Sequence, residues 1–303
     1  DHRLRDAAFS RLHTAIGRAA GQPHALLKRR FFTSNLVDRA KRWTIETGDR
    51  PSLTFLNLME AHSPYYPPKR AFRELGLDPP GVVEPRTLNA RLLAYVMGKS
   101  DLSPGNRERV MEFYDASLRY QDGKLEDLLS VLRSRGLFDD AMIVICADHG
   151  KTLGDYDRGA TPPHYVRDIN VNVPLLIKWP NQRRGERVDA PVELADLFAA
   201  IHDAGDTDEL ATREAGALVE DHVPHTGRNA ADVVRWRVLA DRSKKYVRSE
   251  TGEEFLLARG ADETMVDAAP GELGPYRDRL RDRVDALDAP AGSMEESEGD
   301  IGG

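Results

Sequence analysis

The stretch MIVICADHGKTLGD, residues 142–155, combines an apolar run with a polar ending. Its first six residues do not alternate with polar ones, which is typical of a strand covered on both faces of a sheet. The run stops at Asp148 and His149, and Gly150 follows directly. The stretch therefore predicts a buried strand over residues 141–147. That strand ends in a carboxylate, an imidazole and a glycine at which the backbone can turn sharply.

Segments on either side of this strand alternate between strand-like and helical patterns. Residues 53–59 and 173–179 are apolar runs of strand length. Between them, four leucines at helical spacing predict a helix over residues 107–135, and Gly136 stands where a glycine commonly ends a helix. A shorter helix is predicted over residues 194–204. This alternation favours an α/β fold with a mostly parallel sheet flanked by helices.

The pattern changes after residue 215. Residues 235–240, 245–248 and 254–257 are short strand-like runs, and a Thr-Gly pair separates the last two. They predict a small antiparallel sheet, followed by a helix over residues 275–287. We therefore expect an α/β core over residues 1–215, a small α+β subdomain over residues 216–290 and a disordered tail over residues 291–303.

The composition excludes several classes of protein. The chain has 303 residues, of which 40% are apolar and 31% charged, values that are ordinary for a globular protein. The net charge of −7 argues against nucleic-acid binding, and no apolar run approaches the ~20 residues of a membrane span. The opening residues lack a signal-peptide core, so we expect a cytoplasmic protein. The single cysteine, Cys146, excludes an internal disulfide, and its apolar neighbours predict a buried, inert thiol.

Polar residues follow two of the predicted strands. Ligands of open α/β sheets bind outside the carboxyl ends of the strands, where Asp148 and His149 stand. His62 stands a few residues past the end of the predicted strand 53–59. Because a carboxylate and a neutral imidazole are both good metal ligands, these residues predict a site for a metal and an anion. The alternative is a plain turn with an exposed histidine. Taken alone, His62 could be bonded to a backbone carbonyl, and His164 is a weak candidate.

Three blocks of sequence carry a family resemblance. They are FLNLMEAHSPYYPP, YDASLRYQDGKLEDLLSVLRSRGLFDDAMIVICADHGKTLGD and VPLLIKWP. In this order they closely resemble the sulfatase family of the alkaline-phosphatase superfamily. The resemblance is strong over residues 50–205 and continues weakly through residues 234–268. The ordered set is specific, because a chance match of all the blocks is improbable.

The resemblance implies a role for each candidate residue. Asp148 and His149 match the pair that completes the divalent-metal site of sulfatases. The metal is most often Ca²⁺, although an imidazole would also suit Mn²⁺ or Zn²⁺. His62 matches the histidine that contacts the sulfate and helps the leaving oxygen depart. His164 stands where the family places a sulfate-binding Lys or His, but its spacing to the next strand is shorter than usual. The implied partner is a small-molecule or saccharide sulfate ester.

Two parts of the sulfatase pattern are absent from the sequence. The family's nucleophile stands in a C/S-x-P-x-R motif, whose Cys becomes formylglycine, and no such motif occurs here. A strand ending in paired aspartates, which supply further metal ligands, is also absent. We therefore expect a core that is incomplete at its N-terminus, a formylglycine only in the missing segment, and an inactive chain when taken alone. Two alternatives stay open: a phosphonate monoester or phosphodiester hydrolase of the same superfamily, and a non-catalytic sulfatase-like domain.

Overall fold

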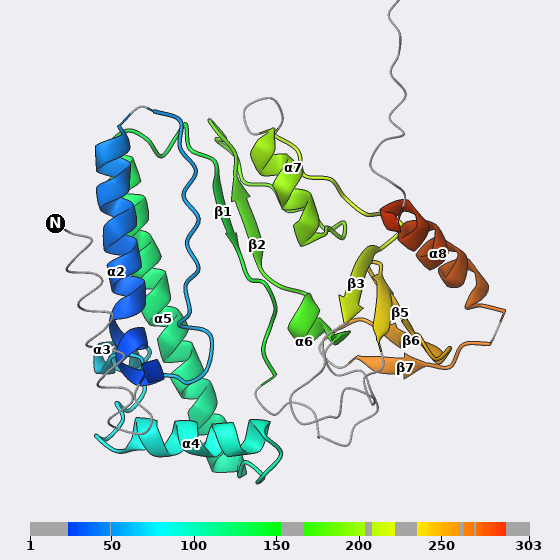
Figure 1. Cartoon of the computed structure of the whole chain (residues 1–303), viewed down its shortest axis with the longest axis horizontal. Helices are drawn as coiled ribbons and strands as arrows, with labels where there is room; N and C mark the ends of the chain where they lie inside the picture. The colour runs from blue at the N-terminus through cyan, green and yellow to red at the C-terminus, as the bar shows by residue number, and fades with distance from the viewer. Residues whose placement is uncertain are drawn as a thin grey trace, which may run out of the picture. The chain divides into compact units, whose positions relative to one another are not determined.

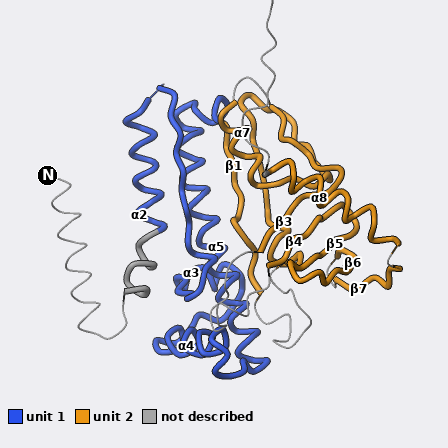
Figure 2. The backbone as a smooth tube through the Cα atoms, turned by 45° about the vertical axis from the view of Figure 1, so that its right-hand side comes forward, with its two compact units in different colours: residues 1–141, 153–157 blue, residues 142–152, 158–303 orange. Residues whose placement is uncertain are grey.

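The structure, a computed structural model, forms two compact units (Figure 2). The first comprises residues 1–141 and 153–157, and the second comprises residues 142–152 and 158–303. The predicted tail over residues 291–303 and the candidate His164 lie outside the described residues. The structure describes residues 24–48, 50–152, 166–203, 208–221, 235–260, 263–269 and 271–288.

The described part of the first unit is helical. Its helices are α2 (His24–Thr47), α3 (Lys69–Glu74), α4 (Glu84–Val96) and α5 (Pro104–Ser134). In Figure 1, α2 runs alongside α5, and Lys41 Nζ of α2 lies 3.8 Å from Asp127 Oδ2 of α5. The apolar core of this unit contains Phe72 and Phe113, whose rings meet edge to face with their centroids 4.9 Å apart.

Local signals at both ends of α5 confirm the helix predicted there. Ser103 caps the first turn, and its hydroxyl accepts a backbone N–H. At the other end Gly136 adopts a φ of 71°, in the left-handed region that favours glycine. Its N–H donates to the carbonyl of Arg133 (3.1 Å), and the N–H of Leu137 donates to that of Leu132 (2.9 Å). These two bonds satisfy carbonyls that the end of a helix leaves open.

The prediction of a strand over residues 53–59 is wrong for the described structure. No strand is assigned there, and Leu53 and Phe55 expose 75% and 86% of their surface. An apolar run becomes a strand only where a neighbouring strand completes its hydrogen bonds. The sheets seen in the described residues are formed by other segments. Residue composition alone could not show that the partner is lacking.

The predicted strands at 141–147 and 173–179 are confirmed but shorter. They are β1 (Ile143–Cys146) and β2 (Leu175–Lys178), which pair with each other antiparallel, Ile143 opposite Lys178. The described residues contain no parallel pair of strands, so the expected mostly parallel sheet is not shown. Cys146 is exposed, contrary to the expectation of a buried thiol. The exposure of Cys146 follows from the size of this sheet, which has only two strands within the described residues.

Within the described residues, three short helical segments lie between β1 and β3 (Ala217–Asp221) in the chain. α6 (Asp168–Val171) precedes β2 in the chain. A 3₁₀ turn, η2 (Leu194–Asp196), leads directly into α7 (Leu197–His202). These two segments confirm the short helix predicted over residues 194–204.

The second sheet confirms the small antiparallel sheet predicted near the C-terminus. It contains five antiparallel strands in chain order. The sequence did not reveal the first and last of them. After this sheet, α8 (Gly274–Asp288) confirms the predicted final helix. The strands are β3 (Ala217–Asp221), β4 (Trp236–Ala240), β5 (Lys244–Ser249), β6 (Glu254–Ala258) and β7 (Thr264–Val266).

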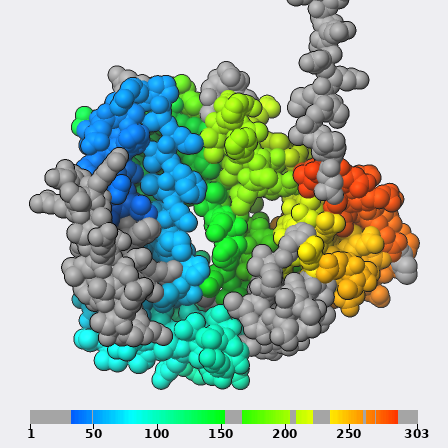
Figure 3. Space-filling model, in the orientation of Figure 1, coloured from blue at the N-terminus to red at the C-terminus, as the bar shows by residue number. Residues whose placement is uncertain are grey.

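The two faces of the five-stranded sheet carry separate apolar clusters. One cluster joins Leu239 and Tyr246 to Leu280 of α8. In Figure 3 the red atoms of α8 lie directly against the yellow and orange atoms of the sheet. The other cluster packs Val166 against Val238 and neighbouring side chains. Both faces of this sheet are therefore covered by parts of the chain itself. Among the helices of the described ranges, none has the length and apolar character needed to cross a membrane.

Candidate functional site

The Asp148–His149 turn follows directly after β1. Asp148 exposes 91% of its side chain and His149 exposes 58%. The backbone N–H of His149 donates to Asp148 Oδ1 at 3.0 Å, a short-range bond that fixes the carboxylate beside the imidazole. His149 Nε2 lies 3.8 Å from Asp148 Oδ2. The turn therefore presents a carboxylate oxygen and a ring nitrogen side by side on an exposed surface.

A backbone contact sets the tautomer of His149. Its Nδ1 lies 2.7 Å from the carbonyl oxygen of Gly150. Because a carbonyl oxygen can only accept, Nδ1 carries the proton in this arrangement, and the lone pair of the neutral ring is on Nε2. This is the bonding pattern that orients metal-binding histidines in proteins.

The spacing of the two groups fits one divalent cation. Two ligands of a calcium ion, each about 2.4 Å from it and at right angles or slightly wider, lie roughly 3.4–3.8 Å apart. The separation of 3.8 Å between His149 Nε2 and Asp148 Oδ2 fits that range. Within the part of the chain that the structure describes, however, no third histidine, cysteine, aspartate or glutamate joins a metal-binding group. These two residues can therefore supply part of a coordination shell.

Gly150 is required by a close approach between two backbone segments. Its N–H donates to the carbonyl of Asn170 in α6 at 2.6 Å. A Cβ at this position would lie 1.8 Å from the carbonyl oxygen of Ile169, closer than any side chain can come. A sharp turn was the expected reason for this glycine, whereas the structure shows that its contact with α6 requires it. Any larger residue would push α6 away from the turn.

His62 belongs to the first unit, and its Nδ1 lies 2.6 Å from the carbonyl oxygen of Ser63. By the same reasoning Nδ1 of His62 carries the proton in this arrangement. Asn89 of α4 holds the loop that follows. Its Oδ1 accepts the N–H of Tyr65 at 2.7 Å, and its Nδ2 donates to the Tyr65 carbonyl at 2.8 Å. The loop is thus anchored to a helix of its own unit.

The structure places Asp148 and His149 together in the second unit, whereas His62 lies in the first. The expected convergence of His62 and His164 with the Asp148–His149 turn therefore stays a prediction. Sequence reasoning missed the residues behind the turn. Lys245, Glu263 and Arg259 bind Asp168 at the start of α6. The available signal was Lys245, which stands in the strand-like run KKYV at a position where a buried strand usually has an apolar residue.

Comparisons with known proteins place the chain among sulfatases. The family model described as Sulfatase matches residues 18–207. A protein named sulfatase from Formosa agariphila is 24% identical over 196 residues, which are 60% of this chain and 38% of the relative. An ulvan-active sulfatase from the same organism is 20% identical over 254 residues, or 78% of this chain and 47% of the relative.

A solved structure shares the fold. Phosphonate monoester hydrolase of Agrobacterium radiobacter superposes with a TM-score of 0.60 at 19% identity, over 85% of this chain and 60% of that one. The chain thus spans less than half the length of both curated relatives. The family model covers more than half of the chain, and the fold is that of sulfatases and related hydrolases. The chain belongs to the sulfatase family of the alkaline-phosphatase superfamily.

Proposed function

We propose that this chain supplies two metal ligands to a sulfatase that hydrolyses sulfate esters. The observation that carries the proposal is the pair formed by Asp148 Oδ2 and His149 Nε2, 3.8 Å apart at the end of β1. Its chemistry suits a divalent cation, and the chain is a member of a hydrolase family. Ca²⁺ is the first candidate, with Mn²⁺ and Zn²⁺ as alternatives.

In this proposal the Asp148 carboxylate and the Nε2 lone pair of His149 bind the cation. A bound divalent cation neutralises the charge of a sulfate group and lowers the pKa of a nucleophile. The contact between His149 Nδ1 and the Gly150 carbonyl holds the ring in the binding tautomer. The negative charge of the Asp148 carboxylate would also attract a cation to this exposed turn.

We assign His62 to the leaving group. Its Nδ1 donates to the Ser63 carbonyl, which fixes the ring, so that a protonated Nε2 can donate to the departing ester oxygen. His164 is proposed to contact the sulfate, by its place in the family pattern. These two assignments require both histidines to reach the Asp148–His149 turn in the working enzyme.

The complete enzyme is proposed to include a further segment that supplies the nucleophile and the remaining metal ligands. The support is that the chain spans only 38% and 47% of its curated relatives and lacks the C/S-x-P-x-R motif. We use the term extended protein for this chain together with the proposed upstream segment. The proposed substrate is a small-molecule or saccharide sulfate ester. The saccharide class is included because one relative is an ulvan-active sulfatase.

The test measures aryl-sulfate and aryl-phosphonate hydrolysis, with calorimetric Ca²⁺ and Mn²⁺ titrations, on this chain and on the extended protein. A formylglycine-generating enzyme is supplied where the nucleophile is Cys. We expect the extended protein to hydrolyse aryl sulfate and to bind Ca²⁺, and this chain to do neither. If the extended protein hydrolyses the aryl phosphonate faster than the aryl sulfate, the proposed activity would be phosphonate hydrolysis and not sulfate-ester hydrolysis. A gene without an upstream segment would favour the non-catalytic alternative.

A further inference from the structure

Lys245 is a fully buried cation in the middle of the five-stranded sheet. Its side chain is 0% exposed, and its Nζ lies 3.0 Å from Asp168 Oδ1 and 2.7 Å from Glu263 Oε1. Nζ also donates to the carbonyl of Val166. Opposite Lys245 on β4 stands Ala240, whose small side chain leaves room for the lysine. The ammonium therefore binds both ends of the short segment that leads into α6.

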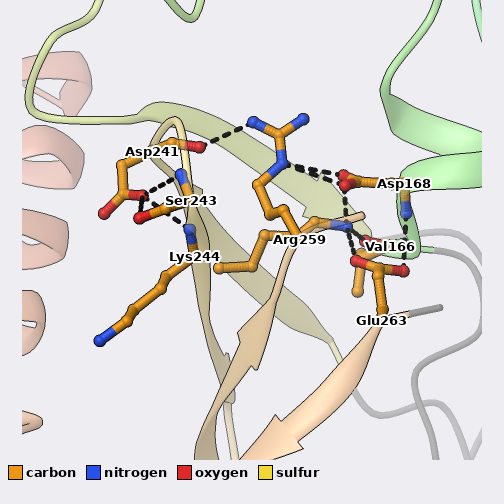
Figure 4. A network of polar contacts seen from close by, with 8 residues as sticks. Val166, Asp168, Asp241, Ser243, Lys244, Arg259 and Glu263 are labelled. Atoms are coloured by element: carbon orange, nitrogen blue, oxygen red, sulfur yellow. Dashed lines mark hydrogen bonds and ion pairs between the residues drawn. The ribbon is translucent and has the colours of Figure 1, made fainter. Parts of the chain in front are cut away.

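Further bonds fix the first residue of α6 (Figure 4). The Nε of Arg259 donates to both carboxylate oxygens of Asp168, at 3.0 and 3.2 Å. The backbone N–H of Asp168 donates to Glu263 Oε2 at 2.8 Å. Arg259 is itself held, because its guanidinium donates to the carbonyl of Asp241 at 2.7 Å. Asp168 is thus bonded to Lys245 in β5, to Arg259 after β6 and to Glu263 before β7.

Stability alone does not explain this arrangement. Burying charged groups carries a desolvation penalty, and replacing a buried ion pair by apolar residues is often neutral or stabilising. The same face of the sheet already has an apolar cluster that includes Val166, Val238 and Val247. An apolar contact would allow α6 to shift along the sheet, whereas directed bonds to one carboxylate allow a single position. The network is therefore suited to fixing where α6 lies.

Gly150 connects α6 to the candidate metal ligands. Asn170 of α6 accepts the Gly150 N–H at 2.6 Å, and Ile169 leaves no room for a Cβ on Gly150. Gly150 in turn offers its carbonyl to His149 Nδ1 at 2.7 Å. A displacement of α6 therefore changes the backbone that sets the orientation of the imidazole.

We infer that Asp168, Lys245, Glu263 and Arg259 are positioning residues that hold the Asp148–His149 turn through α6. The part of this inference that concerns metal binding rests on the proposed function. The mechanical part does not, because it concerns contacts within the second unit alone. The four side chains contact no substrate in this account. They act through Asn170, Ile169 and Gly150.

Two variants test the mechanical part by hydrogen–deuterium exchange on this chain. Asp168→Asn keeps the shape of the side chain and removes its charge. Gly150→Ala breaks the contact between the turn and α6 from the side of the turn, and it changes no residue of the five-stranded sheet. We expect both to speed exchange in residues 148–152 by at least about tenfold, with β4 to β6 changed much less. The matched controls are Glu220→Gln, which breaks an exposed pair with Arg237 on the same sheet, and Gly185→Ala, where no atom lies within 4 Å of an added Cβ.

The outcomes of the exchange experiment separate positioning from general stability. Unchanged exchange in residues 148–152 for both test variants would overturn the inference. It would also be overturned if Asp168→Asn sped exchange in the sheet as much as in the turn, and Gly150→Ala left the turn unchanged. If Asp168→Asn does not fold, Gly150→Ala alone decides whether the contact with α6 controls the turn.

The metal part is tested on the extended protein by the Ca²⁺ concentration that gives half of the maximal rise in melting temperature. Loss of a group that orients a metal ligand typically weakens metal binding by about 10–100-fold. We expect that range for Asp168→Asn and no change for Glu220→Gln. An unchanged midpoint in Asp168→Asn would overturn this part. A wild-type protein that shows no Ca²⁺ response would instead count against the proposed function, and the exchange result would stand independently.

Discussion

The two sheets of this chain differ in how completely they are covered. The five-stranded sheet has an apolar cluster on each face and a buried lysine bound by two carboxylates. The β1–β2 pair has only two strands within the described residues, an exposed Cys146, and Leu176 with 59% of its surface exposed. A two-stranded sheet is marginally stable by itself. The candidate ligands therefore lie on the less covered sheet and depend on the other sheet for their position.

The largest effect on the free energy of unfolding is expected when the buried lysine is replaced. Lys245→Met leaves the Asp168 and Glu263 carboxylates without their ammonium partner, and breaking a buried pair in this way costs about 3–5 kcal/mol. The matched control is Lys244→Met, one residue away and more exposed, which should change the free energy of unfolding by less than about 0.5 kcal/mol. Urea unfolding measures both. Equal effects would show that the network contributes nothing specific to the five-stranded sheet.

The next prediction compares one leucine from each sheet. Leu257 of β6 is 1% exposed, so Leu257→Ala should cost about 2–5 kcal/mol. Leu176 of β2 is 59% exposed, and Leu176→Ala should cost less than about 0.5 kcal/mol in this chain. In the extended protein we expect the cost of Leu176→Ala to rise, because further residues would cover β2. A cost that stays small in both proteins would contradict the expectation that further residues cover β2 in the extended protein.

A smaller, pH-dependent effect belongs to the five-stranded sheet. Hydrogen bonding to Arg277 lowers the pKa of Glu254 to about 2 from its ordinary value of 4.5, with Tyr246 adding a second bond. A carboxyl whose pKa is lowered on folding stabilises the protein above pH 4.5, and this contribution fades as the pH falls towards 2.

Because Arg277 is partly exposed, we expect Glu254→Gln to cost only about 1–2 kcal/mol at pH 7 and almost nothing near pH 2. Thermal unfolding of the wild type and the variant across this pH range measures the difference. A cost independent of pH would mean that packing, and not charge, is the cause. Arg237→Gln, in an exposed pair on the same sheet, is the control and should show little dependence on pH.

Patterns along the chain predicted the elements whose signals are local. The leucine spacing and Gly136 identified α5, and the apolar run before Asp148 identified β1. The direction of pairing was not predictable, because an apolar run has the same composition in a parallel and an antiparallel pair. Residues 53–59 show the same limit, since a strand needs a partner that the run itself does not specify.

The residues that hold the Asp148–His149 turn in place could not be predicted either, for a different reason. Asp168 and Glu263 are 95 residues apart in the sequence, and no periodicity links such a pair. Asp148 and His149 could be identified because they are adjacent and interrupt an apolar strand. Gly150 was identified for the wrong reason, since the close approach of Ile169 becomes visible only when α6 is folded against the turn.

The central claim, that the Asp148–His149 turn binds the metal of a sulfatase, is tested most directly by aryl-sulfate turnover of the extended protein with and without Asp148→Asn at saturating Ca²⁺. Loss of a group that only orients a metal ligand already costs about 10–100-fold, so loss of a ligand should lower kcat/KM by more than about 100-fold. Calorimetry on the same samples should show weakened Ca²⁺ binding. Full turnover by Asp148→Asn, or robust turnover by this chain alone, would contradict the claim.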